Sequence, residues 1–82
     1  MKLLKFYTKN CCQCKVQTKM LESIKDEVEI VSVDCDENED LVEKYNIKSL
    51  PTLVLIRDNG EVIAKYTGVT KPEVLTETIN KQ

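Results

Sequence analysis

The sequence predicts an α/β fold: a four-stranded mixed β-sheet flanked by three helices, in the order β-α-β-α-β-β-α. Apolar strand-like segments alternate with helical patterns in the first half, which indicates two parallel strands joined by a right-handed crossover. An Asn-Gly pair between two apolar runs in the second half indicates an antiparallel hairpin, followed by a last helix. With no linker or internal repeat, we expect residues 1–82 to form a single domain.

The first half supplies the first strand, the longest helix and the second strand. Residues 2–7, KLLKFY, are apolar-rich and end in aromatic residues, which is typical of a buried strand. From Cys11 onward, apolar residues recur at helical spacing and predict an amphipathic helix of about four turns. The apolar face of this expected helix carries Val16, Met20, Leu21 and Ile24. Residues 28–34, VEIVSVD, are rich in β-branched residues and predict the second strand.

The second half begins with a short helix and the hairpin. Asp36 or Asn38 is expected to cap a helix that carries Leu41, Val42 and Tyr45. Residues 51–57 and 61–68 then predict two strands connected through Asp-Asn-Gly.

The last helix is predicted from its first turn. Residues 70–73, TKPE, have the pattern of a capping box with proline in the first turn. The helix that follows is expected to bear Val74, Leu75, Thr78 and Ile79.

Composition and charge exclude several classes of function. The chain is 41% hydrophobic and 32% charged with a net charge of -2, so it has no basic character that would favour nucleic acid. We therefore expect no nucleic-acid partner. The sequence contains neither a signal-peptide hydrophobic region nor an apolar stretch long enough to span a bilayer, so we expect no membrane association and a cytoplasmic location.

Three of the four cysteines fall within the segment KNCCQCK, residues 9–15. Cys11 and Cys14 are three residues apart at the expected start of a helix, where their sulfurs share one face and are close enough to bond. A cysteine at the N-cap receives the helix dipole and free N–H groups, which favours its thiolate. Cys14, one turn further in, is expected to be more buried and more protonated. This asymmetry suits attack by Cys11 on a foreign disulfide, followed by resolution by Cys14.

Other uses of the cysteines remain open at this point. Two structural disulfides would need more widely spread positions than the adjacent Cys11 and Cys12. Zinc normally takes four nitrogen or sulfur ligands, and the chain has no histidine and no second CxxC motif. We expect no metal site, although a soft-metal-binding module and a non-catalytic interaction module are the alternatives to redox chemistry.

The segment KFYTKNCCQCK resembles the thioredoxin pattern, in which an aromatic strand end leads into W-C-G-P-C-K. The segment SLPTLVLIRDNGEVIAKYTG is similar to the I-P-T-L strand, hairpin and glycine loop of that family. The resemblance spans nearly the whole chain, without the N-terminal strand and helix of full-length thioredoxins. It implies a thioredoxin-like fold and a thiol–disulfide oxidoreductase that reduces protein disulfides without any cofactor beyond its redox-active disulfide.

The resemblance also assigns roles to individual residues. Cys11 resembles the attacking cysteine and Cys14 the resolving one. Pro51 resembles the proline that follows a cis peptide bond beside the dithiol, with Leu50 offering backbone groups to an extended substrate. Gly68 resembles the loop glycine next to the substrate. The plainer alternatives are a strand-start proline at Pro51 and an ordinary turn glycine at Gly68.

The chain departs from the family pattern at three places. Asn10 stands where thioredoxins usually have Trp, which changes the surface offered to substrates. Cys12 and Gln13 replace the Gly-Pro pair that tunes the redox potential. Lys5 replaces a buried acid; it either favours the thiolates or reaches into solvent without a role.

Two cysteines lie outside the expected couple. Cys12 is either a tolerated neighbour or a thiol that bridges chains, and a monomer is the expected state. Cys35 follows the second strand and is either a bystander or a regulatory thiol.

The expected electron donor is a thioredoxin-reductase-like protein. Glutathione is expected to serve less well, because no basic residue lies next to Pro51 or after Gly68 to bind its carboxylates, although Lys9 could do so. A glutathione-dependent, glutaredoxin-like activity is the alternative.

Overall fold

A single mixed sheet organises the chain. The computed structural model describes residues 1–82, and its sheet has the strand order β2-β1-β3-β4. β1 runs parallel to β2 and antiparallel to β3, and β4 completes the antiparallel hairpin with β3. The strands are β1 (Lys2–Tyr7), β2 (Glu29–Asp34), β3 (Thr52–Ile56) and β4 (Val62–Thr67). The predicted four-stranded mixed sheet and its hairpin are confirmed.

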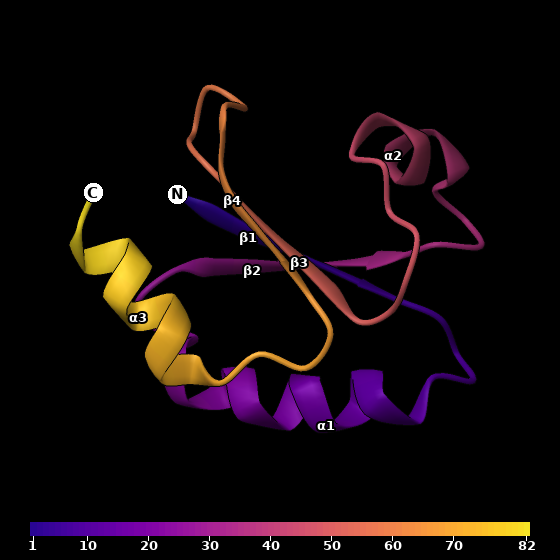
Figure 1. Cartoon of the computed structure of the whole chain (residues 1–82), viewed down its shortest axis with the longest axis horizontal. Coiled ribbons are helices and arrows are strands. Elements are labelled where there is room, and N and C mark those ends of the chain that lie inside the picture. Colours follow the sequence, from indigo (N-terminus) through magenta and orange to yellow (C-terminus); the bar gives the residue numbers. More distant parts are fainter.

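Three helices cover the sheet, as predicted. They are α1 (Cys12–Leu21), which continues into a 3₁₀ turn, η1 (Glu22–Ile24), then α2 (Glu39–Lys44) and α3 (Pro72–Asn80). Figure 1 shows α1 and α3 on one side of the strands and α2 on the other. The element order is therefore the predicted β-α-β-α-β-β-α.

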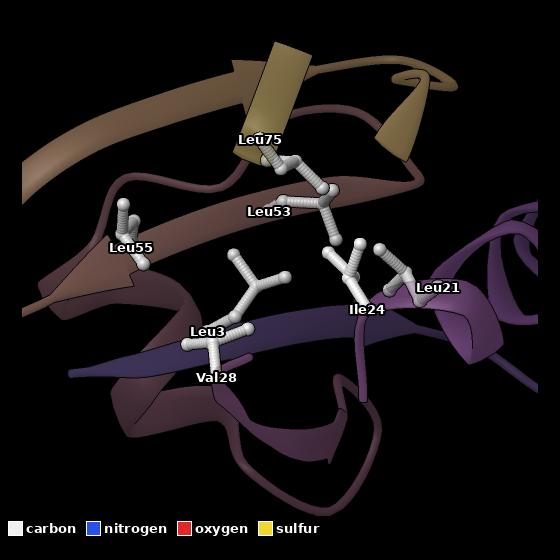
Figure 2. Close-up of a cluster of buried hydrophobic side chains, with 7 residues drawn as sticks. All are labelled: Leu3, Leu21, Ile24, Val28, Leu53, Leu55 and Leu75. Carbon is white, nitrogen blue, oxygen red and sulfur yellow. The ribbon is translucent and has the colours of Figure 1, made fainter. Parts of the chain in front are cut away.

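Each face of the sheet has its own hydrophobic core, because successive residues of a strand point to opposite faces. The core under α1 and α3, drawn in Figure 2, contains Leu3, Leu21, Ile24, Val28, Leu53, Leu55 and Leu75. The core under α2 contains Leu4, Phe6, Val33, Val54 and Ile56, with Leu41, Val42, Tyr45 and Leu50 among the partly buried residues packed against it. Every residue of β3 is buried, as expected for a central strand that is covered on both faces.

The rotation of α1 about its axis differs from the sequence prediction. Val16 is 49% exposed, although it was expected on the apolar face of the helix. The buried residues of α1 are Cys14, Gln17 and Leu21. The inner face of α1 is thus set by a cysteine and a glutamine, which the apolar pattern does not count, and Val16 is turned outward.

The predicted helix caps are only partly correct. The N-cap of α3 is Lys71, without a side-chain cap, so the capping-box prediction is wrong. The Thr70 hydroxyl instead donates to the carbonyl of Gly68 at 3.1 Å. Pro72 does occupy the first turn, as predicted. Asn38 is the N-cap of α2, but its side chain donates to the carbonyl of Asp34 at 3.0 Å and not to the helix.

The connection between β3 and β4 is a tight turn that matches its sequence. Gly60 has a φ of +91°, in the left-handed region that glycine adopts without strain. The Asn59 side chain accepts a hydrogen bond from the backbone N–H of Glu61 at 2.9 Å. The prediction of a hairpin through Asp-Asn-Gly is confirmed. β3 ends at Ile56 and β4 begins at Val62, so these three residues lie in the turn.

Candidate active site

Cys11 and Cys14 form a disulfide at the start of α1, with their Cα atoms 5.2 Å apart. Cys11 is the N-cap, in an extended conformation, and its sulfur accepts a hydrogen bond from the backbone N–H of Cys14 at 3.1 Å. Cys14 is only 3% exposed, whereas Cys11 is half-buried. A helix N-terminus stabilises negative charge, so the Cys11 sulfur is placed to become the thiolate when the pair is reduced.

The Leu50-Pro51 peptide bond is cis, and Pro51 is buried. Thr52, the next residue, pairs with Phe6 at the end of β1. Pro51 therefore lies at the sheet edge where β1 leads into the loop that carries Cys11. The backbone N–H of Gly68 donates to the Pro51 carbonyl at 2.8 Å, which joins the glycine loop to this proline.

Gly68 is required by its backbone conformation in this chain. Its φ of +85° lies in the left-handed region that residues with a side chain rarely adopt. A Cβ atom built at this position would meet no atom within 4 Å. The backbone conformation at this position therefore explains why it is a glycine, whereas a lack of space for a side chain does not.

Gln17 is a residue of the site that the sequence analysis missed. Its side chain is fully buried, donates to the carbonyl of Thr70 at 2.9 Å and accepts from the N–H of Thr70 at 2.7 Å. This pair of hydrogen bonds fastens the loop after Gly68 to the helix that begins with the disulfide. The available signal was a polar residue three positions after Cys14, on the helix face that carries Cys14 and Leu21.

Lys5 is buried beneath α1 and does not reach into bulk solvent, since it is only 7% exposed. Its Nζ donates to the Thr18 hydroxyl at 2.8 Å and lies 5.7 Å from the centre of the Tyr7 ring. None of the ion pairs in the protein involves it. Burial lowers the pKa of this ammonium below its ordinary value.

A cavity of about 290 Å³ lies between α1 and the strands and joins Lys5 to the disulfide. We call it the Lys5 cavity; its lining residues are Lys5, Tyr7, Thr8, Lys9, Cys11, Cys14, Lys15, Thr18 and Ser32. The Thr18 hydroxyl also donates to the carbonyl of Cys14 at 2.9 Å, so a chain of hydrogen bonds runs from the Lys5 ammonium to the backbone of Cys14. The lining contains three lysines and no acidic residue.

The remaining predicted residues near the disulfide lie on the surface. Asn10, Cys12 and Gln13 are exposed, and Leu50 is partly buried against the core under α2. Cys12 is a free thiol that does not line the Lys5 cavity.

Cys35 lies apart from the disulfide, on the other side of the sheet. It packs against the core under α2, and its backbone N–H donates to the Tyr7 carbonyl at 2.9 Å. Burial first, and then the negative charges of Asp34 and Asp36, raise the pKa of its thiol above the ordinary value. No three histidine, cysteine or acidic side chains gather closely enough to hold a metal ion.

Comparison with known proteins adds a family to this geometry. The thioredoxin family model matches residues 1–81. Thioredoxin of Bacillus subtilis is 36% identical over 83 residues, a match that covers 96% of this chain and 79% of that protein. A Schizosaccharomyces pombe protein named as a protein disulfide-isomerase is 38% identical over 85 residues, but the match covers only 17% of its length.

The fold gives the same result. The structure of thioredoxin-2 of the malaria parasite superposes with a TM-score of 0.89 at 28% identity, covering 99% of this chain and 82% of that one. None of the helices is both long and apolar enough to cross a bilayer. With a disulfide at the CxxC spacing and a family match over nearly its whole length, the chain belongs to the thioredoxin family and is a thiol–disulfide oxidoreductase.

Proposed function

We propose that this protein, acting as one domain and as a monomer, reduces disulfides in protein substrates. Reduced Cys11 attacks one sulfur of the substrate disulfide and forms a mixed disulfide, while the other substrate sulfur leaves as a thiolate. Cys14 then attacks the Cys11 sulfur and releases the second substrate sulfur. Two electrons pass to the substrate, and the Cys11–Cys14 disulfide remains on the protein.

The observation that carries this proposal is the asymmetry of the two sulfurs. Cys11 is the more exposed one, and its sulfur already accepts the N–H of Cys14 at 3.1 Å. Cys14 is 3% exposed, which keeps it from reacting first with a bulky substrate. The accessible, stabilised sulfur attacks and the buried one resolves.

The substrate is proposed to lie across Leu50, Pro51 and Gly68, with Asn10 at the border of this surface. The hydrogen bond from Gly68 to Pro51 and the pairing of Thr52 with Phe6 support this proposal, because they hold two loops at the sheet edge next to the Cys11 loop. An extended substrate segment would pair with the backbone of Leu50. Asn10 offers a small polar side chain where thioredoxins usually have the large ring of Trp. We therefore expect substrate binding here to depend less on apolar contacts than it does in those thioredoxins.

Lys5 is proposed to tune the reactivity of the dithiol. Its buried ammonium and both redox cysteines line the same cavity, so a thiolate formed on either cysteine would offset part of the positive charge of Lys5. Cys12 and Gln13, which lie between the two cysteines, are proposed to contribute to the same tuning. A Lys5→Met variant whose Cys11 alkylation shows an unchanged pH profile would argue against a role for Lys5.

The electron donor is proposed to be a thioredoxin-reductase-like flavoenzyme of the cytoplasm, so that the protein takes part in electron transport and cell redox homeostasis. No cofactor is needed beyond the disulfide itself. The family membership supports this choice. Cys35, with its protonated and partly buried thiol, is proposed to have at most a regulatory role.

The test is reduction of insulin disulfides with NADPH and a bacterial thioredoxin reductase, compared with NADPH, glutathione and glutathione reductase. The proposal expects turnover with the thioredoxin reductase and little with glutathione. A Cys11→Ser variant should be inactive, while Cys12→Ser should retain most of the turnover. Faster turnover with glutathione would show a glutaredoxin-like enzyme instead, and activity of Cys11→Ser would refute the dithiol mechanism.

A further inference from the structure

The Lys5 cavity carries a charge pattern that protein-disulfide reduction does not explain. Lys5, Lys9 and Lys15 line it together with the hydroxyl-bearing residues Thr8, Thr18 and Ser32, and no carboxylate contributes. The whole chain has more acidic than basic residues, with a net charge of -2. The three lysines beside the disulfide, with no acidic residue among them, therefore differ in charge from the chain as a whole. They create a local positive field.

Lys5 is the centre of this field. It is only 7% exposed and has no acidic partner, so its charge is removed from water without compensation by an opposite charge. An ammonium has three N–H donors, and Lys5 directs one of them to Thr18. A small anion that entered the cavity would supply both the missing charge and an acceptor for the remaining donors.

The size of the cavity restricts the anion. A volume of about 290 Å³ is at the lower end of the range of ligand pockets, which suits a small molecule. Its lining does not include Leu50, Pro51 or Gly68, so it is separate from the surface proposed for protein substrates. It does include both redox cysteines, so a ligand in it lies beside both residues of the couple.

We propose that the Lys5 cavity is a binding site for small disulfides that carry a carboxylate a few bonds from the sulfur. The carboxylate binds among Lys5, Lys9 and Lys15, and this position brings the ligand disulfide to Cys11. The inference rests on the proposed dithiol chemistry, and it adds a second substrate class to it.

The reaction balances with the groups already described. The Cys11 thiolate attacks the nearer sulfur of the small disulfide, whose other half leaves as a mercaptocarboxylate thiolate. The Cys14 thiolate then attacks the Cys11 sulfur and releases the second half in the same form. The two electrons come from the Cys11–Cys14 dithiol, and the released thiolates take protons from water according to their pKa values.

The test compares three disulfides of similar size in single-turnover reactions of prereduced protein, so that no electron donor is needed. Dithiodipropionate is anionic, bis(hydroxyethyl) disulfide is neutral and cystamine is cationic. At low salt we expect the anionic disulfide to react roughly tenfold faster than the cationic one, once their reaction rates with free dithiothreitol have been used to correct for intrinsic reactivity. The preference should shrink as salt is added.

The variants Lys9→Gln and Lys15→Gln together should reduce the anionic preference to about twofold or less. Lys19→Gln combined with Lys25→Gln is the matched control, since it removes two lysines near the same helix that do not line the cavity. The control should keep the preference. An equal loss of preference in both double variants would mean that only net charge matters, and it would overturn the proposal.

The failures of the two proposals are distinguishable. If none of the three disulfides is reduced, the dithiol mechanism itself fails. If all three react at equal corrected rates, only the anion site fails.

Binding can also be measured without any redox step. Suberate has the length of dithiodipropionate without the sulfurs, and octanediol is its uncharged counterpart. In NMR titrations of the oxidised protein, suberate should shift the amide signals of Thr8, Thr18 and Ser32, and octanediol should not. Equal shifts from both compounds, or shifts from neither, would contradict the site.

Discussion

At the scale of single residues, the protein separates the environments of its four cysteines. Cys11 and Cys14 face the Lys5 cavity, Cys12 is exposed on the first turn of α1, and Cys35 lies against the core on the other face of the sheet. Only the first two are close enough to bond. The reactivity of each thiol therefore depends more on where it lies in the folded protein than on how far it is from the other cysteines in the sequence.

Cys35 should react slowly at neutral pH. Burial and the charges of Asp34 and Asp36 raise the pKa of its thiol, so it remains protonated and becomes reactive only as the pH rises above the ordinary thiol range. In the oxidised protein, iodoacetamide should modify Cys12 before Cys35 at pH 7, and the difference should narrow at alkaline pH. Peptide mass mapping over time measures both rates. Faster modification of Cys35 at pH 7 would contradict its described environment.

The burial of Lys5 should cost stability in the oxidised protein. Because its pKa is lowered in the folded state, the cost is fully present below the folded pKa and disappears as the pH rises towards the ordinary value of 10.5. Lys5→Met should therefore raise the free energy of unfolding at pH 7 by on the order of 1 kcal/mol. The gain should become smaller near pH 10. Urea unfolding at the two pH values measures it, and a variant that is less stable than the wild type at pH 7 would contradict this account.

At the scale of elements, α1 and the loop before α3 form one unit. Gln17 joins them through two hydrogen bonds to the backbone of Thr70, and the loop is joined to Pro51 through Gly68. The helix that carries the disulfide and the loops proposed to bind substrate are thus held in a fixed relation.

Replacing Gln17 should loosen this unit. Gln17→Leu leaves the partly buried N–H and carbonyl of Thr70 without these partners, so we expect a loss of about 1–3 kcal/mol in the free energy of unfolding. Insulin reduction should slow as well, because the loop after Gly68 is no longer fastened. Lys19→Leu, at an exposed position of the same helix, is the control and should leave both quantities nearly unchanged. Equal stability of the two variants would show that the Thr70 hydrogen bonds contribute little.

The elements were predictable because their patterns are local. The strand β1, the Asp-Asn-Gly hairpin and the proline-led last helix all follow from short-range periodicity and turn preferences. The error at Val16 has a simple cause: an apolar pattern counts valines and overlooks the buried Cys14 and Gln17. Gln17 is buried only because Thr70, 53 positions away, supplies partners, and no local pattern carries that information.

At the scale of the whole molecule, stability depends on two cores that share one sheet. The core under α1 and α3 is closed by Leu75, which is fully buried, whereas its neighbour Val74 is 45% exposed. These adjacent residues of α3 allow a direct comparison of burial on one helix.

Leu75→Ala should destabilise the protein by about 2–5 kcal/mol, since it leaves a cavity among closely packed leucines. Val74→Ala should change the free energy of unfolding by less than about 0.5 kcal/mol. Urea unfolding of both variants gives the comparison. A similar effect of the two substitutions would mean that α3 is not packed as described.

Part of the site was predictable, because some of its residues belong to short sequence motifs. The spacing of Cys11 and Cys14 and the Pro51 motif are local signals, and the structure brings each to the same edge of the sheet. The Lys5 cavity was not predictable, because it forms only when Lys5 and Ser32 from two strands meet α1. Its charge pattern is a property of the folded molecule.

The central claim is that Cys11 attacks and Cys14 resolves, and trapping tests it most directly. A Cys14→Ser variant, reduced and mixed with a disulfide-containing protein, should accumulate a mixed disulfide that peptide mass mapping assigns to Cys11. Cys11→Ser should trap almost none, because Cys14 is buried. A mixed disulfide found on Cys12 or Cys14, or equal trapping by both variants, would contradict the assignment of these roles.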